Sequence, residues 1–140
     1  MRLVITRRSD LATRALLELA RTGERTKASV LADQVGTTPG FLSQAMTPLV
    51  AQSWVRSDPG PTGGYTVRVD PAALTVLEVI EAVEGPTDTG RCVLEDRPCA
   101  GTGAAGLCAL HRPWSGARAQ LLVELGRTPL SSLLEPETVS

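Results

Sequence analysis

The feature that most constrains this 140-residue chain is the gathering of its metal-binding residue types in one short segment. All three cysteines and the single histidine lie between Cys92 and His111. Thiolate and imidazole are the groups that hold zinc ions and iron–sulfur clusters in proteins. Between them Gly101, Gly103 and Gly106 allow the backbone to turn tightly around a small group. We interpret the segment as a metal-binding loop and the rest of the chain as what the metal controls.

Length and composition allow a single small domain with an extension. Hydrophobic residues make up 42% of the chain but aromatic residues only 3%, so small aliphatic side chains must form the core. No apolar stretch is long enough to span a membrane, and Met1 is not followed by the apolar run of a signal peptide. We therefore expect a cytoplasmic protein whose cysteines are ligands and not disulfides.

The charge is unevenly divided between the two halves of the chain. Residues 1–70 carry nine Lys or Arg and six Asp or Glu, whereas residues 71–140 carry five and nine. A basic first half joined to an acidic second half favours a module that faces nucleic acid.

The first 51 residues predict three helices. Ser9 or Asp10 is the expected cap of the first helix, Thr26 of a second over 27–35, and Thr38 of a third that opens with Pro39. A short turn at 36–38 joins the last two, which is the helix-turn-helix arrangement, and a plain three-helix bundle is the alternative. On the second and third helices we expect the following side chains to be buried in the core: Val30, Leu31, Val35, Phe41, Leu42, Ala45, Leu49 and Val50. The polar face of the third helix would carry Thr38, Gly40, Ser43, Gln44 and Thr47 into a major groove.

A β-hairpin is predicted directly after these helices. Residues 54–57 and 65–69 alternate like strands, and the Pro- and Gly-rich stretch 58–64 is typical of a hairpin tip. A helix-turn-helix followed by a hairpin is a winged helix. Gly63 and Gly64 remove side chains from the expected approach of the wing to a sugar-phosphate backbone.

Two further helices are predicted in the second half. Thr75 and Glu78 form a capping box for a helix that ends at Gly85, with Leu77, Ile80 and Val83 expected inside. A last helix beginning near Pro113 carries an apolar stripe of Trp114, Ala117, Leu121 and Leu125. We expect this stripe to pack on a partner subunit, because two-fold DNA sites need two-fold readers, and packing back on its own domain is the alternative.

The predicted fold class is mainly α with a small β-hairpin. Its parts are a winged helix-turn-helix domain at 1–70, a connector helix and Cys-rich loop at 71–111, a dimerisation helix and final turn at 112–134, and a tail at 135–140. No phosphate-binding glycine loop is present and the only histidine has only cysteines near it in sequence, so we do not expect an enzyme.

Several of these motifs together resemble the Rrf-type family of winged-helix transcriptional regulators, which includes the iron–sulfur sensors IscR and NsrR. The matching features are the Met1-Arg-Leu opening, the helix-turn-helix, the wing segment Gly60–Tyr65, the segment Ile80–Gly85, and the three-cysteine loop followed by His111 and Trp114. The resemblance implies a homodimeric regulator, most simply a repressor, that binds a pseudo-palindromic double-stranded operator. It also implies an iron–sulfur cluster in each loop that senses redox state, nitric oxide or iron and cluster supply.

Carried onto this sequence, the resemblance makes Cys92, Cys99 and Cys108 the thiolate ligands and His111 the fourth ligand, as in the IscR branch. In the NsrR branch the fourth ligand is an early aspartate of the other subunit, which would be Asp10. A 2Fe–2S cluster is preferred and a 4Fe–4S cluster is the alternative. A structural zinc ion, or a metal-free thiol switch in which Cys92 or Cys99 joins Cys108, are the competing hypotheses.

Three departures from the family pattern concern the site and the DNA surface. Eight residues separate Cys99 from Cys108, more than is usual, Pro59 stands where the family commonly has arginine, and Pro48 lies inside the third helix. The residues expected to contact DNA are Arg2, Lys27, Thr37, Thr38, Gly40, Ser43, Gln44, Thr47, Arg56, Thr62, Gly63, Gly64 and Tyr65.

Overall fold

Helices dominate the fold, as expected from the sequence, and the only β-hairpin among the described residues lies in the first half of the chain. The structure is a computed structural model that describes residues 3–95, 97–99 and 107–134. Arg2, the glycines at 101, 103 and 106, and the predicted tail at 135–140 lie outside these ranges. In chain order the elements are α1 (Arg7–Thr22), α2 (Ala28–Val35), α3 (Pro39–Ala51), β1 (Val55–Asp58), β2 (Gly64–Val67), η1 (Pro71–Ala73), α4 (Val76–Glu84), α5 (His111–Gly126) and η2 (Leu130–Leu134).

The first helix begins earlier than the sequence indicated. Thr6 is its cap, because the Thr6 side chain accepts a hydrogen bond from the backbone N–H of Ser9 at 3.2 Å. Ser9 and Asp10, the expected caps, lie inside the first turn. Gly23 ends the helix in the left-handed conformation with a φ of 66°, which glycine adopts readily.

The second helix is capped differently from the prediction. Lys27 occupies the cap position without a side-chain hydrogen bond, and the helix starts at Ala28. Thr26 instead forms an isolated β-bridge with Tyr65, with backbone hydrogen bonds of 2.9 Å in both directions. This bridge fastens β2 to the segment that precedes α2.

The third helix confirms its predicted start. The Thr38 side chain accepts from the N–H of Phe41 at 3.3 Å, and Pro39 takes the first helical position. Pro48 lies within the helix, which nevertheless runs on to Ala51. Ser53 then adopts a φ of 62° in the turn that leads into β1.

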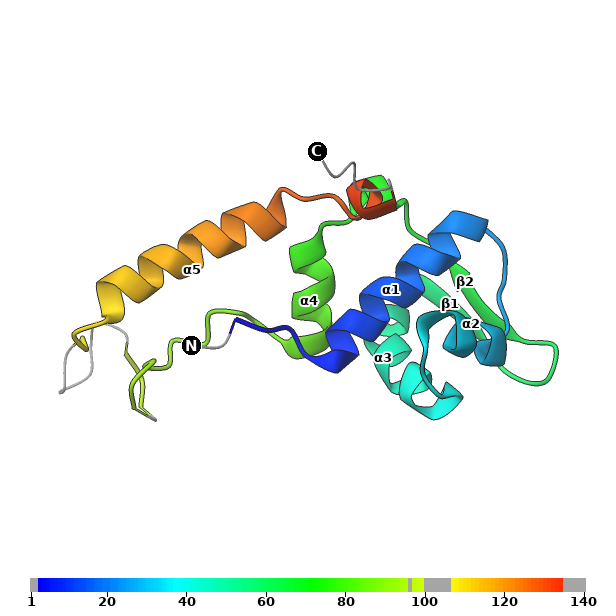
Figure 1. The fold of residues 1–140 in the computed structure, drawn as a ribbon, viewed down its shortest axis with the longest axis horizontal. Helices are drawn as coiled ribbons and strands as arrows, with labels where there is room; N and C mark the ends of the chain where they lie inside the picture. Colours follow the sequence, from blue (N-terminus) through cyan, green and yellow to red (C-terminus); the bar gives the residue numbers. More distant parts are fainter. Residues whose placement is uncertain (1–2, 96, 100–106, 135–140) are drawn as a thin grey trace.

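The hairpin pairs β1 and β2 antiparallel, with Val55 opposite Val67 and Asp58 opposite Gly64. It forms the predicted wing and lies with α2 at one end of the molecule (Figure 1). At the opposite end of the same view, α5 projects from the body as an arm.

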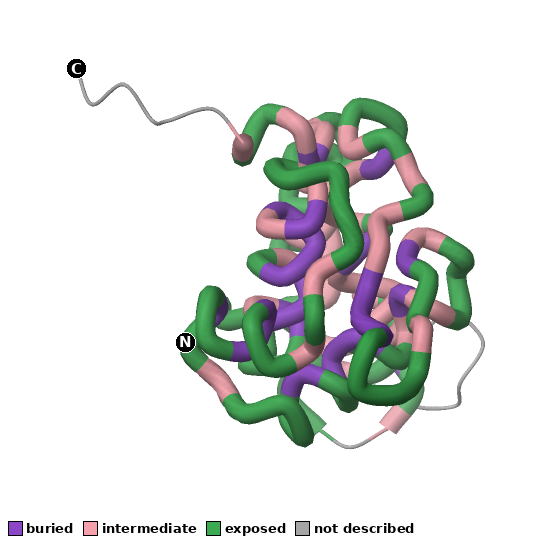
Figure 2. Tube along the Cα trace, turned by 90° about the vertical axis from the view of Figure 1, so that its right-hand side faces the viewer, coloured by how far each residue is buried: buried purple, intermediate pink, exposed green. Residues whose placement is uncertain are grey.

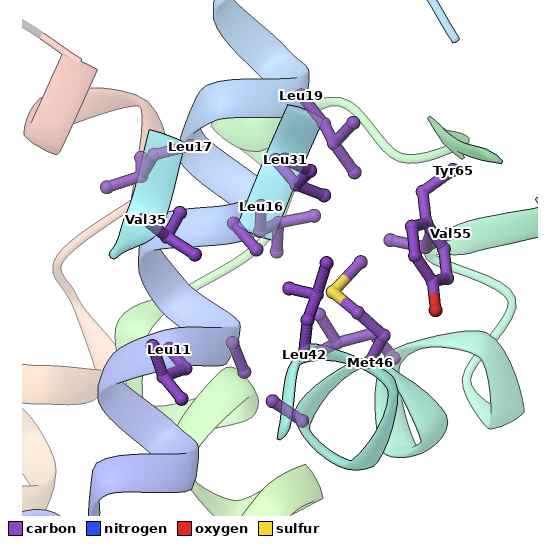
Figure 3. Close-up of a cluster of buried hydrophobic side chains, with 14 of the residues drawn as sticks. Leu11, Leu16, Leu17, Leu19, Leu31, Val35, Leu42, Met46, Val55 and Tyr65 are labelled. Atoms are coloured by element: carbon purple, nitrogen blue, oxygen red, sulfur yellow. The ribbon is translucent and has the colours of Figure 1, made fainter. Parts of the chain in front are cut away.

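The hydrophobic core is built around α1 and lies between the helices and the hairpin (Figure 3). Leu11, Leu16 and Leu19 of α1 are buried, together with Leu31, Leu42 and other side chains of α2, α3 and the wing. In Figure 2 the buried positions gather in the interior of the molecule and the exposed positions lie around them. The fourth helix packs against both α1 and α3, so the core continues beyond the wing.

Several predicted core residues are placed elsewhere. Val30 is 45% exposed and Phe41 is 59% exposed. Each lies one residue, or about 100°, from the stripe that its helix buries. On α4 the fully buried residue is Val79, whereas Leu77, Ile80 and Val83 are only half-buried.

The last helices connect the core to the arm. Thr75 and Glu78 form the predicted capping box of α4, with the Thr75 N–H donating to the Glu78 carboxylate at 2.7 Å. The fifth helix begins at His111, two residues before the predicted start, and contacts α4. Leu130 of η2 is buried, and an isolated bridge pairs Pro129 with Thr75. Within the described ranges no helix has the length and apolar character needed to cross a membrane.

Candidate metal centre and nucleic-acid interface

The cysteine loop brings its first two cysteines together by a short antiparallel contact. Arg91 and Pro98 form an isolated bridge. The Cys92 N–H donates to the Arg97 carbonyl at 2.8 Å, and the Cys99 N–H donates to the Gly90 carbonyl at 2.9 Å. Gly90 has a φ of 71°, a conformation that favours glycine. Local backbone pairing therefore places the two thiols side by side although six residues separate them.

The third cysteine and the histidine belong to the start of α5. The His111 N–H donates to the Cys108 carbonyl at 3.1 Å, a one-turn contact at the helix entrance. The Cys108 N–H approaches the Cys99 sulfur at 3.5 Å, and this contact ties the beginning of α5 to the cysteine loop.

These contacts assemble the predicted thiol ligands into one cluster. The Sγ atoms of Cys92, Cys99 and Cys108 all lie within 4.8 Å of one another. His111 is not part of this mutually close set, but its Nδ1 atom lies 3.4 Å from the Cys99 sulfur. Cys99 is buried, and Cys92 and Cys108 are half-buried. All three are free cysteines. Three convergent sulfurs with an imidazole beside them fit the donor sets of zinc and of iron–sulfur clusters.

Backbone N–H groups point at two of the sulfurs. The Leu94 N–H donates to the Cys92 sulfur at 3.4 Å, and that hydrogen bond lowers the pKa of the Cys92 thiol below its ordinary value. Partial burial raises the pKa of the Cys108 thiol, because desolvation disfavours its charged form. Of Cys92 and Cys108, Cys92 therefore has the thiol with the lower pKa.

The thiols line a cavity of about 150 Å³ that also includes residues missed in the sequence. Trp114, Ser115 and Arg118 of α5 line it together with Asp88, which lies before the loop. The three helical residues follow His111 at spacings of three, four and seven, and so share its face of α5. A start of the helix at His111 would have revealed them, whereas nothing in the sequence pointed to Asp88.

An ion pair links the two sides of this cavity. The Arg118 guanidinium donates to the Asp88 carboxylate at 3.4 Å, and the same carboxylate oxygen accepts from the Gly90 N–H at 3.0 Å. Gly90 in turn holds the backbone of Cys99. Asp88 therefore connects the loop that carries two thiols to the helix that carries His111.

The alternative ligand Asp10 lies elsewhere in this chain. It is in the first turn of α1, where its carboxylate pairs with Arg14 at 3.4 Å. It is not among the residues that line the cavity.

Glu84, the last residue of α4, connects the start of α1 to the segment that precedes the cysteine loop. The Glu84 carboxylate accepts hydrogen bonds from the hydroxyl of buried Ser9 and, at 3.4 Å, from the N–H of Thr6. The carboxylate thus lies at the amino end of α1, where the helix dipole favours a negative charge. Two residues further on, Pro86 leads into the loop.

Most of the predicted DNA-contacting residues are exposed. On α3 these are Thr38, Gly40, Ser43, Gln44 and Thr47, and on the other elements they are Lys27, Arg56 and Thr62. Thr37 is half-buried. The hydroxyl of Thr47 donates to the Ser43 carbonyl at 2.9 Å, and Arg56 pairs with Asp58 at 3.1 Å. Ser43 and Gln44 thus face outward beside one another on α3.

The part of the wing that lies next to Thr26 is buried instead. Tyr65 is 8% exposed and contributes its ring to the core (Figure 3), and Gly63 and Gly64 are also buried. A Cβ atom at Gly64 would meet the Thr26 carbonyl oxygen at 2.3 Å, and one at Gly63 would meet the Asp58 oxygen at 1.9 Å. The reason for these glycines is close backbone packing within the wing, and we assign Tyr65 to the same packing.

Comparisons with known proteins agree on one class. Residues 5–136 match the profile of the family Rrf2, described as "Iron-dependent Transcriptional regulator". ORF2 of Azotobacter vinelandii, whose name assigns it to the HTH-type transcriptional regulators, is 30% identical over 93% of this chain and 78% of its own. The HTH-type transcriptional regulator IscR of Xenorhabdus nematophila is 26% identical over 96% of this chain and 81% of its own.

A solved structure supports the fold. CymR, the global cysteine regulator of B. subtilis, superposes with a TM-score of 0.75 over 95% of this chain and 97% of its own, at 24% identity. At that identity the likeness concerns the architecture alone.

Proposed function

The chain belongs to the Rrf2 family of transcriptional regulators, and from this premise we propose that it is a repressor whose operator binding is gated by an iron–sulfur cluster. The relatives found are DNA-binding regulators and not enzymes. The observation that carries the proposal is the convergence of three thiols within 4.8 Å, beside the ring of His111.

In this proposal Cys92, Cys99, Cys108 and His111 hold the cluster. When bound, the cluster supplies reversible one-electron chemistry and reactivity toward small oxidants such as nitric oxide. The N–H groups of Leu94 and Cys108 donate toward the sulfurs, as is common around ligating thiolates, whose properties such hydrogen bonds adjust. A 2Fe–2S cluster suits three thiolates and one imidazole, and a 4Fe–4S cluster is the alternative.

The cysteine loop is connected to the proposed DNA-contacting helices through α4 and α1, which pack against each other. The loop leaves α4 beyond Glu84, which is hydrogen-bonded to the start of α1, and α1 packs against α3. The thiols also hold the start of α5 through the contact between Cys108 and Cys99. Gating requires that the loaded and the stripped loop stabilise different arrangements of these helices.

We propose a homodimer that binds a pseudo-palindromic operator in the cytoplasm. Support comes from exposed apolar side chains on two sides of α5, since Leu121 is 40% and Val123 is 57% exposed and α5 has no fully buried residue. Apolar side chains on α5, away from the helix-turn-helix, suit contact with a second copy of the chain, which would bring two DNA-binding domains together. The exposed polar residues of α3, together with Lys27, Arg56 and Thr62, form the proposed DNA surface, to which Arg2 is added from the sequence.

A metal-free thiol switch is the second candidate, and the closeness of the three thiol sulfur atoms supports it. Cys92 carries the lowered pKa and would attack, and a small oxidant such as a peroxide would accept the two electrons released as Cys92 and Cys108 form a disulfide. Their sulfurs already lie within 4.8 Å, although bonding requires them to approach to about 2.05 Å.

The deciding experiment is anaerobic purification followed by a visible absorption spectrum and assays for iron and acid-labile sulfide. We expect a coloured protein with stoichiometric iron and sulfide, whose affinity for duplex DNA changes by about 5- to 150-fold when the iron is removed. Replacing Cys99 by Ser should abolish the colour. Replacing His111 by Ala should shift the spectrum, and Asp10→Ala should leave it unchanged.

Other outcomes would separate the alternatives. One zinc per chain in a colourless protein would overturn the cluster and leave a structural site. A protein that stays colourless and metal-free after reconstitution with iron and sulfide would favour the thiol switch. A shift caused by Asp10→Ala instead of His111→Ala would transfer the fourth ligand to α1.

A further inference from the structure

Phe41, the only phenylalanine of the chain, is exposed where a core side chain is expected. It is 59% exposed and neither belongs to the hydrophobic core nor packs against it. Single exposed apolar residues are common on protein surfaces, but an exposed aromatic ring near the start of the second helix of a helix-turn-helix lies where side chains meet base edges. We propose that Phe41 reads DNA sequence by an apolar contact with the C5-methyl group of a thymine, an inference that rests on the proposed DNA binding.

The local structure presents the ring at the reading end of α3. Phe41 is the third residue of the helix, and its N–H is the donor to the Thr38 cap. The N-terminal residues of the second helix of a helix-turn-helix are those that meet base edges. Before Phe41 in the same turn, Gly40 has open space at its Cβ position, so no side chain beside it shields the ring on that side.

The neighbouring side chains supply the complementary contacts. Gln44 lies one turn after Phe41, and both are exposed. A glutamine amide pairs with the N6 and N7 atoms of adenine, whereas an aromatic ring meets the methyl group of thymine in the major groove. Together they favour an operator half-site rich in A·T pairs under the start of α3.

A second copy of this chain is a poor occupant of the Phe41 surface. The apolar face proposed for dimerisation is on α5, which projects from the end of the molecule opposite to α2 and the wing (Figure 1). The buried stripe of α3 is Leu42, Ala45, Met46 and Leu49, and it already faces the core of the same chain. The ring therefore lies on the proposed DNA surface and not on the proposed dimer surface.

The test uses the full chain, with and without its iron, to select duplexes from a random double-stranded library. Each thymine of the best half-site is then replaced, one at a time, by deoxyuridine, which lacks only the methyl group. At one thymine of the half-site we expect the replacement to lower the affinity of the wild-type protein about fourfold, which corresponds to the loss of one buried methyl group. Phe41→Ala should bind the thymine duplex more weakly than wild-type protein, and its affinity should not change when deoxyuridine replaces that thymine. The effects of the protein substitution and of the base replacement would then be non-additive, as expected for groups in contact.

The controls separate contact from folding. Phe41→Leu keeps an apolar side chain and should retain part of the thymine preference. Both variants should unfold at the wild-type temperature, because Phe41 makes no core contact.

Three results would overturn the proposal. Binding of wild-type protein to a selected sequence that tolerates deoxyuridine at every thymine would overturn the methyl contact while leaving the regulator intact. An unchanged affinity and sequence preference of Phe41→Ala would mean that the ring faces another partner. Failure of the wild-type protein, loaded and stripped, to select any sequence would overturn the proposed regulation together with this inference.

Discussion

At the scale of single residues, the glycines of this chain differ in what surrounds them. Gly64 has a φ of 149° and faces the backbone of Thr26, whereas Gly40 on α3 has open space around its Cβ position. Both precede residues of functional interest, but only the first is required by close packing of two backbone segments.

Replacing Gly64 by Ala should therefore destabilise the protein strongly. The added methyl group would have to displace the Thr26 carbonyl and the bridge to Tyr65, and we expect a loss of about 2–4 kcal/mol in the free energy of unfolding. Gly40→Ala is the matched control, which should be neutral or stabilising by about 1 kcal/mol. Urea unfolding measures both, and equal effects of the two substitutions would contradict this account of the wing.

The three cysteines also differ as residues. In the metal-free, reduced protein Cys92 should react with iodoacetamide before Cys108 near pH 8, because its lowered pKa populates the thiolate at lower pH. Cys108 should react at higher pH, since its pKa is raised. Mass spectrometry of the peptides across a pH series measures this order. A Cys108 that is labelled before Cys92 would contradict it.

At the scale of secondary structure elements, α5 has two faces with different surroundings. Trp114, Arg118 and Leu125 are half-buried, whereas Ala117 and Leu121 are exposed, although the sequence placed Trp114, Ala117, Leu121 and Leu125 on one stripe. The inner face lines the cavity beside the thiols, and the outer face is open. The helix therefore joins the candidate metal centre to the proposed dimer contact.

The ion pair between Arg118 and Asp88 should stabilise this junction modestly. Arg118→Gln should accelerate loss of iron to a chelator about two- to fivefold, and in the metal-free protein it should speed exchange of the Cys99 amide hydrogen. The effect is small because the Asp88 side chain is 60% exposed and the pair is partly screened. The control is Arg127→Gln, which removes an exposed pair with Glu124 at the far end of the same helix. Equal rates in the two variants would contradict a specific role for the pair.

At the scale of the whole molecule, α2 and the wing lie at the end opposite to α5, with α1 and α4 between them (Figure 1). Three further apolar residues, Leu3, Val4 and Ile5, are exposed before α1. Exposed apolar groups on the arm and on these first residues suit the proposed partner copy.

The proposed dimer gives a direct prediction. Leu121→Glu combined with Val123→Glu should convert the protein to a monomer, because two charges would be placed in the proposed apolar contact. Operator affinity should fall at least about tenfold, since a monomer engages only one half-site. Analytical ultracentrifugation and DNA titration measure the two effects. The control is Val30→Glu, at an exposed position of α2, which should leave the mass of the dimer unchanged. A double variant that remains dimeric would show that the dimer contact is not on α5.

Local features of the fold could be predicted because they are decided by nearby residues. The Thr38 cap with Pro39, the capping box of Thr75 and Glu78, and the hairpin each depend on hydrogen bonds or turns within a few positions. The cysteine cluster was also evident, since no other part of the chain carries cysteine or histidine. These interactions need no distant partner, and so the sequence by itself determined them.

Burial and pairing between distant segments were decided only by the tertiary structure. Tyr65 is a core residue because its strand pairs with Thr26, which lies before α2, and Asp88 belongs to the candidate centre because it pairs with Arg118 of α5. Phe41 became exposed because α3 turns the adjacent Leu42 stripe toward α1, leaving the ring about 100° away. Periodicity shows that a helix has an apolar side but not how wide a strip its neighbours cover. That width depends on the elements that pack against it, and their positions follow from the fold as a whole.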